Sequence, residues 1–356
     1  MTTPNEFVDF LFASRTGALG RYDDRRLQWT LPDYTSPPLP DALAATPAAY
    51  RDDDAIEKMR LAAANGTCSD DPNLCQIAFV PDPTVWSADS MKLGVLFYGG
   101  ALVDPRGYSV LADKLANEYG LPTMIAVFEA DIPPSLCSAD RLDLARERAA
   151  EVTPSVEKWI VAGHSYGGVA AAGTAWLGLV NSTTAADSVV TGLVLLASDV
   201  QPAVSCDPLG YEGMNFTSLP DFKVAAVVAS NDMVLNMTRW QENAKYLSED
   251  ALKVEIEGGN HAQFGSYNNS ERVAILGPRQ KDGNTTITPL EQWTIVVDSI
   301  YEVAKRTGVA LPERLTEAPT MAPTLAPHSA ATVAGSSSWS LMLLTLFVVM
   351  ITALRR

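Results

Sequence analysis

The stretch Val161-Ala-Gly-His-Ser-Tyr-Gly-Gly-Val-Ala-Ala-Ala-Gly173 decides the fold of this chain. An apolar run ends at Ser165, which stands between glycines in a Gly-x-Ser-x-Gly pattern, and an alanine-rich run follows. This order predicts a buried strand, a sharp turn and a helix. A match this short also arises by chance, so its meaning depends on the rest of the chain.

Short apolar runs alternate with amphipathic segments from Gln76 onward. Segments with apolar residues spaced by three and four predict helices at 107–120, 138–152, 166–180, 238–247 and 291–307. The apolar runs predict seven strands, at 76–81, 92–100, 123–130, 158–165, 191–200, 223–232 and 252–259. This alternation is typical of an α/β fold, in which helices cover both faces of a parallel sheet. Ligands bind beyond the carboxyl ends of such strands, so the residues that end strands are the candidates for chemistry.

Ser165 ends one of these strands and is the candidate nucleophile. Gly163 and Gly167 flank the turn, where a side chain would clash with neighbouring backbone, and this leaves the serine hydroxyl projecting from the sheet. The backbone N–H of Tyr166, at the start of the helix, then points to where an oxyanion would form. The other interpretation is a serine that only occupies a tight turn.

A serine nucleophile needs a base, and the chain has three histidines. His164 adjoins the serine, so its side chain should leave the turn in another direction. His328 lies in a proline-rich tail. His261 remains, in a loop just past the last predicted strand, and is the candidate base; the alternative is a structural histidine in a polar loop.

The base in turn needs a carboxylate that fixes its tautomer. Asp232 ends the strand at 223–232, and Asp199, at the end of the strand at 191–200, is the rival. We favour Asp232 because its strand is followed promptly by a helix and then by the strand that leads to His261. Either aspartate could instead cap a turn.

A second oxyanion donor is expected in the loop after an earlier central strand. The strand at 92–100 ends in Tyr98-Gly-Gly100, and paired glycines allow backbone N–H groups to approach a substrate carbonyl. Gly100 and Ala101 are the candidate donors. A simple Gly-Gly turn is the alternative.

In the order and spacing of these candidate residues, the chain resembles the α/β-hydrolase superfamily. Within that superfamily it resembles the compact fold-5 branch, which is related to dienelactone hydrolase and small esterases. The likeness rests on segments 97–108, 161–168, 193–198, 227–232 and 258–267, which read FYGGALVDPRGY, VAGHSYGG, LVLLAS, VVASND and GGNHAQFGSY. The resemblance implies a mostly parallel eight-stranded sheet, no cofactor, and a Ser-Asp-His triad that falls on Ser165, Asp232 and His261. Relatives often carry a Gly-Asp-Gly segment later in the chain, and QKDGNTTITPLEQW (280–293) is its counterpart.

The chain departs from that branch in two ways. Dienelactone hydrolases use a cysteine nucleophile, so the serine here argues against their substrate. The interval from Ser165 to Asp232 is too short for a large cap domain, although segment 199–220 could form a modest lid.

Composition narrows the range of partners. A net charge of −16 and a pI of about 4.6 would repel nucleic acid. The four cysteines form no CxxC pair, which argues against a structural zinc site and predicts no metal.

Cys68 and Cys75 could close a small disulfide loop. We expect a small-molecule ester as the partner, while the sequence leaves the oligomeric state and the acyl and alcohol groups open.

Several features point to the secretory pathway and a membrane. A stalk rich in Pro, Thr, Ala and Ser (316–340) leads into an apolar run (341–354) that ends in Arg355-Arg356. Small residues from Ser329 fit a GPI signal, whereas the final arginines fit a stop-transfer or tail anchor. A buried C-terminal helix is the third alternative. Sequons for N-glycosylation begin at Asn65, Asn181, Asn215, Asn236, Asn268 and Asn284.

The first twenty residues do not resemble the signal peptide that the secretory pathway requires, because they lack a basic start and Asp9 interrupts their apolar patch. Either the start is truncated and the domain reaches the cell surface or secretory pathway, or the protein is tail-anchored with a cytosolic domain.

These predictions divide the chain into four parts: an irregular N-terminal segment with a short helix (1–75), a catalytic domain (76–310), the stalk (311–340) and the hydrophobic tail (341–356). The expected function is that of a membrane-tethered, carboxylesterase-like serine hydrolase that works through an acyl-enzyme. The alternative is a catalytically inactive hydrolase fold that serves as a surface binding module.

Overall fold

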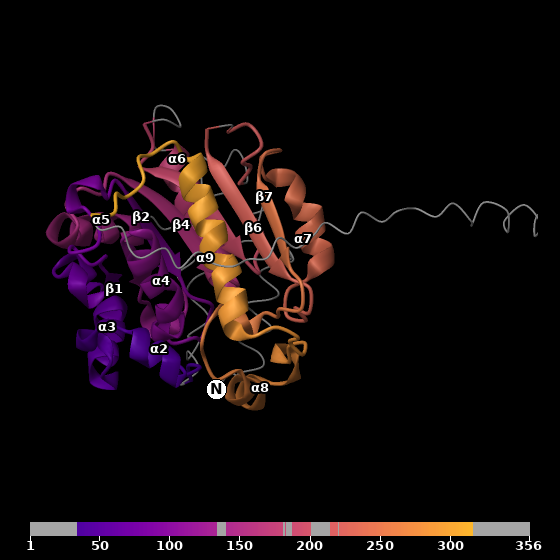
Figure 1. Cartoon of the computed structure of the whole chain (residues 1–356). Coiled ribbons are helices and arrows are strands. Elements are labelled where there is room, and N and C mark those ends of the chain that lie inside the picture. The colour runs from indigo at the N-terminus through magenta and orange to yellow at the C-terminus, as the bar shows by residue number, and fades with distance from the viewer. Residues whose placement is uncertain are drawn as a thin grey trace, which may run out of the picture. The chain divides into compact units, whose positions relative to one another are not determined.

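Seven strands form one sheet in the part of the chain that the computed structural model describes, which comprises residues 34–133, 140–180, 182, 187–200, 214–219 and 221–315. The strand order is β1-β3-β2-β4-β5-β6-β7 (Figure 1). β1 pairs antiparallel with β3, and the other neighbouring pairs are parallel. The strands are β1 (Gln76–Phe79), β2 (Leu93–Tyr98), β3 (Thr123–Ala126), β4 (Lys158–His164), β5 (Val190–Leu196), β6 (Lys223–Ala229) and β7 (Leu252–Ile256).

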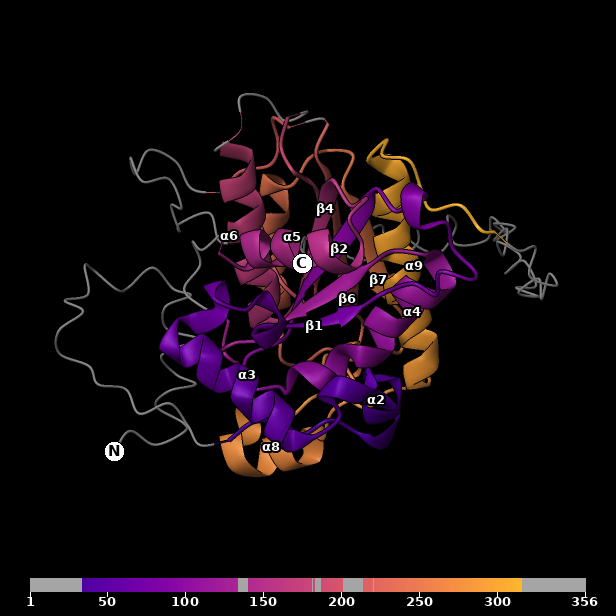
Figure 2. The same ribbon diagram turned by 90° about the vertical axis from the view of Figure 1, so that its left-hand side faces the viewer.

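Helices cover both faces of this sheet. α4 and α9 lie on one face, and α5 and α6 lie on the other (Figures 1 and 2). The longest, α9, begins with a capping box in which Thr288 and Glu291 satisfy each other's backbone N–H groups. The helices are α2 (Pro40–Ala45), α3 (Asp53–Asn65), α4 (Ser109–Tyr119), α5 (Asp140–Val152), α6 (Tyr166–Val180), α7 (Met237–Asn243), α8 (Asn269–Leu276) and α9 (Pro289–Arg306).

The alternation of side chains along β2 explains why its sequence is apolar without a break. Val95 and Phe97 enter the core beneath α4 and α9, whereas Leu96 and Tyr98 enter the core beneath α5 and α6. All four are at most 1% exposed. Burying one large apolar side chain contributes about 1.5–3 kcal/mol to folding. Because both faces of β2 bury such side chains, this central strand stabilises the packing of helices on both sides of the sheet.

Among the described residues, the sheet has one strand fewer than the eight that the family resemblance implies. In the described residues before β1, the chain forms α2 and α3 instead of a further strand. Asp52 caps α3 by accepting from the N–H of Asp54, and Gly66 ends it in a left-handed conformation (φ 69°). Good helix formers between these two caps favour a helix over a strand.

The segment before β1 is joined to the sheet by ionic and covalent links. Arg60 of α3 pairs with Asp131 at 2.6 Å and with Asp104 at 2.9 Å, and both carboxylates are buried. A disulfide between Cys68 and Cys75 connects the end of α3 to the start of β1. These links hold α3 against the loops that follow β2 and β3.

Several predicted features lie outside the described residues: Cys137, Cys206, the sequon at Asn181, most of segment 199–220, and the stalk from residue 316 onward with His328 and the hydrophobic tail. Within the described ranges, no helix is both long and apolar enough to cross a membrane.

Candidate functional site

The candidate nucleophile occupies a strained turn between β4 and α6. Ser165 is half-buried and has a φ of 54°, which is uncommon for a residue with a side chain. A Cβ atom at Gly163 would lie 2.3 Å from the carbonyl oxygen of Gly167, and one at Gly167 would lie 2.1 Å from that of Gly99. The two glycines are therefore required by the close approach of backbone, as the sequence predicts.

Asp232 and His261 meet at the carboxyl ends of β6 and β7. The Nδ1 atom of His261 lies 2.8 Å from Oδ2 of Asp232, and both side chains are buried. Because an ionised carboxylate only accepts, Nδ1 carries the proton and donates it, and Nε2 is left as the basic nitrogen. The other oxygen of Asp232 accepts from the backbone N–H groups of Val234 and Leu235.

These contacts determine the protonation of Asp232. Burial raises its pKa, but the charge and hydrogen bond of His261 and the two backbone N–H groups outweigh burial. The pKa of Asp232 is therefore lower than its ordinary value, and the carboxylate is ionised at neutral pH.

The rival carboxylate has other partners. Asp199 accepts from Arg239 Nε at 2.8 Å and from the side-chain amide of Asn243 at 2.9 Å. Arg239 and Asn243 both belong to α7, so Asp199 connects the end of β5 to that helix.

His164 occupies a buried position beside the candidate base. Its Nδ1 atom lies 2.9 Å from the hydroxyl of Tyr108, and its ring centroid lies 4.6 Å from that of His261. Burial lowers the pKa of His164 well below its ordinary value, and the charges of His261 and Arg272 act in the same direction. His164 is therefore neutral at physiological pH.

The loop after β2 passes beside the serine. A Cβ atom built on Gly100 would lie 3.5 Å from Cβ of Ser165. The N–H of Gly100 already donates to the Tyr108 hydroxyl at 2.8 Å. Of the two candidate oxyanion donors in this loop, Gly100 is thus disfavoured and Ala101 remains.

The same loop is tied down at its next residue. Leu102 has a φ of 57°; its N–H donates to the carbonyl of Asp131, and its carbonyl accepts from Ser36 and from Arg272. These bonds hold a conformation that leucine seldom adopts by itself.

One carboxylate that sequence reasoning assigned no role joins the acid and base loops. Asp282 accepts from the N–H of Met233, which follows Asp232, and from the N–H of Ala262, which follows His261, at 3.1 and 2.7 Å. Its third donor is the N–H of Gly283. The only sequence signal was its place in the counterpart of the Gly-Asp-Gly segment.

Among the described residues, no group of three histidine, cysteine, aspartate or glutamate side chains is arranged to hold a metal ion. The candidate site combines a strained serine, a histidine–carboxylate pair and a loop with backbone N–H groups, an arrangement that suits nucleophilic acyl transfer.

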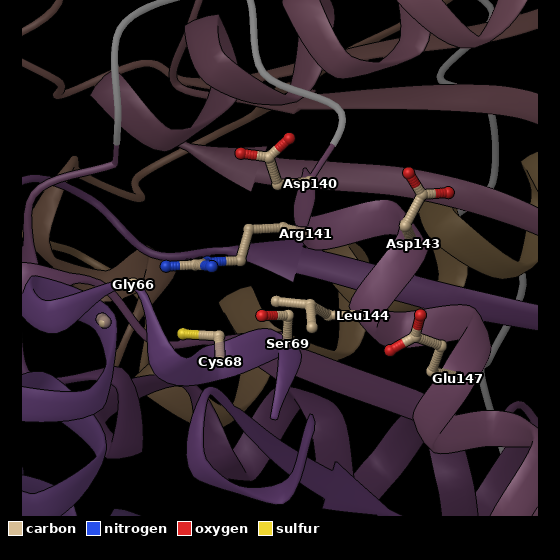
Figure 3. Close-up of a pocket in the computed structure, with 9 residues that line it drawn as sticks. Gly66, Cys68, Ser69, Asp140, Arg141, Asp143, Leu144 and Glu147 are labelled. Atoms are coloured by element: carbon tan, nitrogen blue, oxygen red, sulfur yellow. The ribbon is translucent and has the colours of Figure 1, made fainter. Parts of the chain in front are cut away.

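A cleft of about 430 Å³ lies elsewhere, between the end of α3 and the face of α5 (Figure 3). Ser69 and Arg141 line it together with the carboxylates of Asp140, Asp143 and Glu147. Its described lining includes neither a histidine nor the strained serine, so these residues offer no nucleophile and base for the same chemistry.

Comparison with known proteins identifies the family. A sequence profile of the alpha/beta hydrolase family matches residues 94–294, more than half of the chain. The chain belongs to the alpha/beta hydrolase family. The matched range contains Ser165, Asp232 and His261, and the fold is the alpha/beta-hydrolase fold without a large cap domain.

The solved structures that the chain resembles include esterases. Esterase 2 of Thermogutta terrifontis is 15% identical, with 67% of this chain and 91% of that chain covered and a TM-score of 0.44. Est1E of Butyrivibrio proteoclasticus, solved with ferulic acid, is 12% identical, with 65% and 95% covered and a TM-score of 0.42. A Pyrobaculum calidifontis esterase is 16% identical, with 59% and 76% covered and a TM-score of 0.38. No curated protein matches the chain significantly.

Proposed function

We propose that this alpha/beta hydrolase is a serine hydrolase that cleaves an ester or related acyl substrate through an acyl-enzyme. The observation that carries the proposal is the 2.8 Å contact between His261 and Asp232. It lies at the carboxyl ends of β6 and β7, on the same edge of the sheet as the end of β4, which bears Ser165. When a carboxylate accepts the Nδ1 proton of a buried imidazole, the Nε2 atom of that imidazole is left free to accept a proton as the base.

The reaction begins when the Ser165 hydroxyl attacks the carbonyl carbon of the substrate. His261 takes the hydroxyl proton on Nε2, and Asp232 stabilises the imidazolium. The backbone N–H groups of Tyr166 and Ala101 receive the oxyanion of the tetrahedral intermediate.

Collapse of the intermediate breaks the bond to the alcohol, which leaves with the proton from His261. The acyl group is then bonded to Ser165. A water molecule gives its proton to His261 and attacks the acyl carbon, and the second collapse releases the acid and returns the proton to Ser165.

The proposal is tested by hydrolysis of p-nitrophenyl esters of increasing acyl length. We expect Ser165→Ala to lower kcat by about 10⁴-fold or more, because it removes the nucleophile itself. The matched control is Ser69→Ala, an exposed serine that follows Cys68 and lies outside every sequon, which should keep the wild-type rate. Equal rates for wild type and Ser165→Ala on every ester would overturn the proposal.

We also propose that the C-terminal tail tethers the domain to a membrane after passage through the secretory pathway. The apolar run at 341–354, the sequons and the Cys68–Cys75 disulfide support it, because disulfides persist in oxidising compartments. Asn65, Asn236 and Asn284 are exposed and therefore accessible to glycosylation.

Two treatments of cells that express the full chain test the tether. A gel-mobility shift after glycosidase digestion is expected, and its absence would place the domain in the cytosol. Release of the protein by a phosphatidylinositol-specific phospholipase would identify a GPI anchor, whereas retention in the membrane fraction would identify a spanning tail. A protein found wholly outside the membrane fraction before treatment would contradict the tether.

A further inference from the structure

We infer that Tyr108 and His164 are a positioning pair that fixes the loop Gly99–Ala101 against the nucleophile turn, so that the N–H of Ala101 faces the developing oxyanion. The inference rests on the proposed serine hydrolase function and assigns roles to two residues that take no part in the proton transfers.

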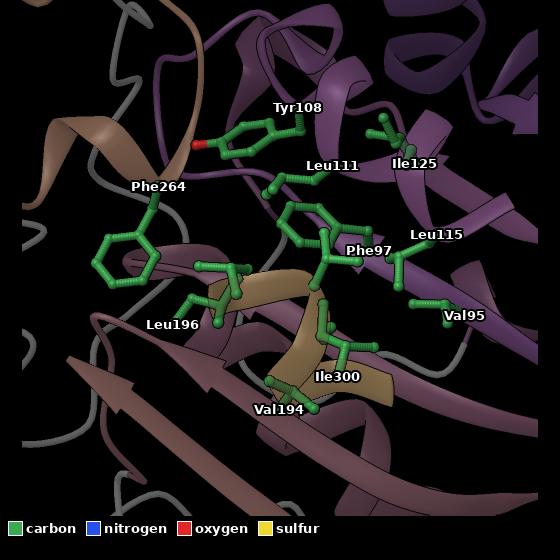
Figure 4. Close-up of a cluster of buried hydrophobic side chains, with 14 of the residues drawn as sticks. Val95, Phe97, Tyr108, Leu111, Leu115, Ile125, Val194, Leu196, Phe264 and Ile300 are labelled. Carbon is green, nitrogen blue, oxygen red and sulfur yellow. The ribbon is translucent and has the colours of Figure 1, made fainter. Parts of the chain in front are cut away.

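The hydroxyl of Tyr108 joins two parts of the site. It accepts the N–H of Gly100 at 2.8 Å and lies 2.9 Å from Nδ1 of His164, the residue immediately before the nucleophile. Tyr108 is 1% exposed, and its ring packs against Phe97 with centroids 5.1 Å apart. In Figure 4 it lies at one end of the buried cluster, with its oxygen directed toward the side where Phe264 stands. The tyrosine therefore has little freedom to move.

The protons on this chain of contacts can be assigned. Because Gly100 supplies the N–H, the Tyr108 oxygen is the acceptor in that bond, and its own proton is available for His164 Nδ1. That requires a neutral His164 with its proton on Nε2. Burial keeps His164 neutral at physiological pH, as an acceptor at Nδ1 must be.

The pair of Tyr108 and His164 also contacts the loop that bears the proposed base, His261. The ring of His164 lies 4.6 Å from that of His261 and stacks on Phe264, which follows the base, with centroids 5.4 Å apart. His164 thus packs between the loop that supplies oxyanion donors and the loop that supplies the base.

The bond to Tyr108 has a direct consequence for catalysis. It occupies the N–H of Gly100 and so fixes the peptide plane next to that of Ala101. An oxyanion donor stabilises the transition state only if it is placed before the reaction, and losing one typically lowers kcat by about 10²–10³-fold. Loosening the loop should have a smaller effect of the same kind.

The matched test compares two buried tyrosines. Tyr108→Phe removes the hydroxyl but keeps the ring, and Tyr98→Phe does the same at a tyrosine whose hydroxyl bonds Thr174 of α6 at 2.9 Å. Both changes delete a buried hydroxyl contact, yet only the first one touches Gly100 and His164. A loss of activity caused by weaker folding alone would be shared by both variants.

The measurement is the rate of phosphonylation by a fluorophosphonate probe, which needs no knowledge of the natural substrate. We expect Tyr108→Phe to lower kinact by about 10- to 100-fold with KI within about twofold, and Tyr98→Phe to stay within about threefold of wild type. His164→Asn retains an acceptor near the position of Nδ1 and should keep most of the rate. His164→Leu should fall as far as Tyr108→Phe.

The outcomes separate the inference from the function on which it rests. Labelling of wild type and Ser165→Ala at the same rate would overturn both. Labelling that depends on Ser165, with Tyr108→Phe no slower than Tyr98→Phe at equal Tm, would overturn the inference and leave the serine hydrolase intact. His164→Leu at the rate of His164→Asn would contradict the role of the histidine as acceptor.

Discussion

His164 and His261 lie with their ring centroids 4.6 Å apart, and they have different partners. His261 bonds the carboxylate of Asp232, whereas His164 bonds the hydroxyl of Tyr108. A carboxylate stabilises the charge that a base acquires, and a neutral hydroxyl does so far less. The two neighbouring imidazoles therefore differ in the group that bonds Nδ1, and this difference suits His261 to the proposed role of base and His164 to that of a neutral support.

The first prediction concerns the carboxylate. We expect Asp232→Asn to lower kcat/KM by about 10³- to 10⁴-fold, because the amide stabilises neither the required tautomer nor the imidazolium. Asp199→Asn is the control: it still accepts from Arg239 and should stay within about threefold of wild type. Ester hydrolysis at neutral pH measures both. The reverse order of effects would assign the acid to Asp199.

The second prediction concerns the carboxylate that joins the two loops. Asp282→Ala removes the acceptor of the N–H groups of Met233 and Ala262. The positions of Asp232 and His261 relative to each other should therefore become less well fixed. We expect kcat to fall by about 10- to 100-fold with little change in KM. Asp282→Asn keeps one acceptor oxygen and should lie between Asp282→Ala and wild type. The control is Asp250→Ala, an exposed carboxylate that pairs with Lys223. An unchanged kcat in Asp282→Ala would refute the positioning role.

The third prediction is a pH dependence of stability. The pKa of His164 is lowered on folding from an ordinary value of 6.5, with burial as the main cause. On acidification the unfolded chain therefore binds this proton first, and the free energy of unfolding falls as the pH drops below about 6.5, by at most about 1.4 kcal/mol per pH unit.

A comparison of wild type with His164→Asn isolates the contribution of His164, because the substitution removes only this ionisable group. Tyr108, His261 and Arg272 are the ionisable groups that act on His164, and the substitution leaves them in place. Urea unfolding followed between pH 5 and 8 should give a flatter profile for the variant. Parallel profiles would mean that His164 has its ordinary pKa in the folded state.

The fourth prediction tests how α3 is held. The side chain of Arg60 is 16% exposed, and its partners Asp131 and Asp104 are 1% and 3% exposed. Arg60→Ala should lower the free energy of unfolding by about 3 kcal/mol, because it leaves buried carboxylates without this charge. Lys92→Ala, which breaks the exposed pair with Glu157, should lower it by at most about 1 kcal/mol. Similar losses in the two variants would show that α3 docks by other contacts.

The strands could be predicted from the sequence because those of the parallel core are buried on both faces and therefore read as continuous apolar runs. All seven predicted runs overlap strands, and the run at 158–165 differs from β4 only at Ser165. α2 was missed because six residues with a proline at the start carry too little periodicity. The eighth strand was expected from the resemblance and not from any apolar run.

The supporting residues of the site could not be predicted in the same way. Tyr108 and His164 are 56 positions apart, and Asp282 bonds residues 20 and 49 positions before it. A single sequence does not encode such contacts as a local pattern. Ser165 and His261 could be proposed from the sequence because the first has a local motif and the second was left by elimination.

The central claim is that Ser165 is the nucleophile of this site. The most direct test is to react the full chain with a fluorophosphonate, digest it and locate the adduct by mass spectrometry. We expect one modified residue, Ser165, with labelling that is lost in His261→Ala as well as in Ser165→Ala. An adduct on another residue, or undiminished labelling of Ser165→Ala, would contradict it.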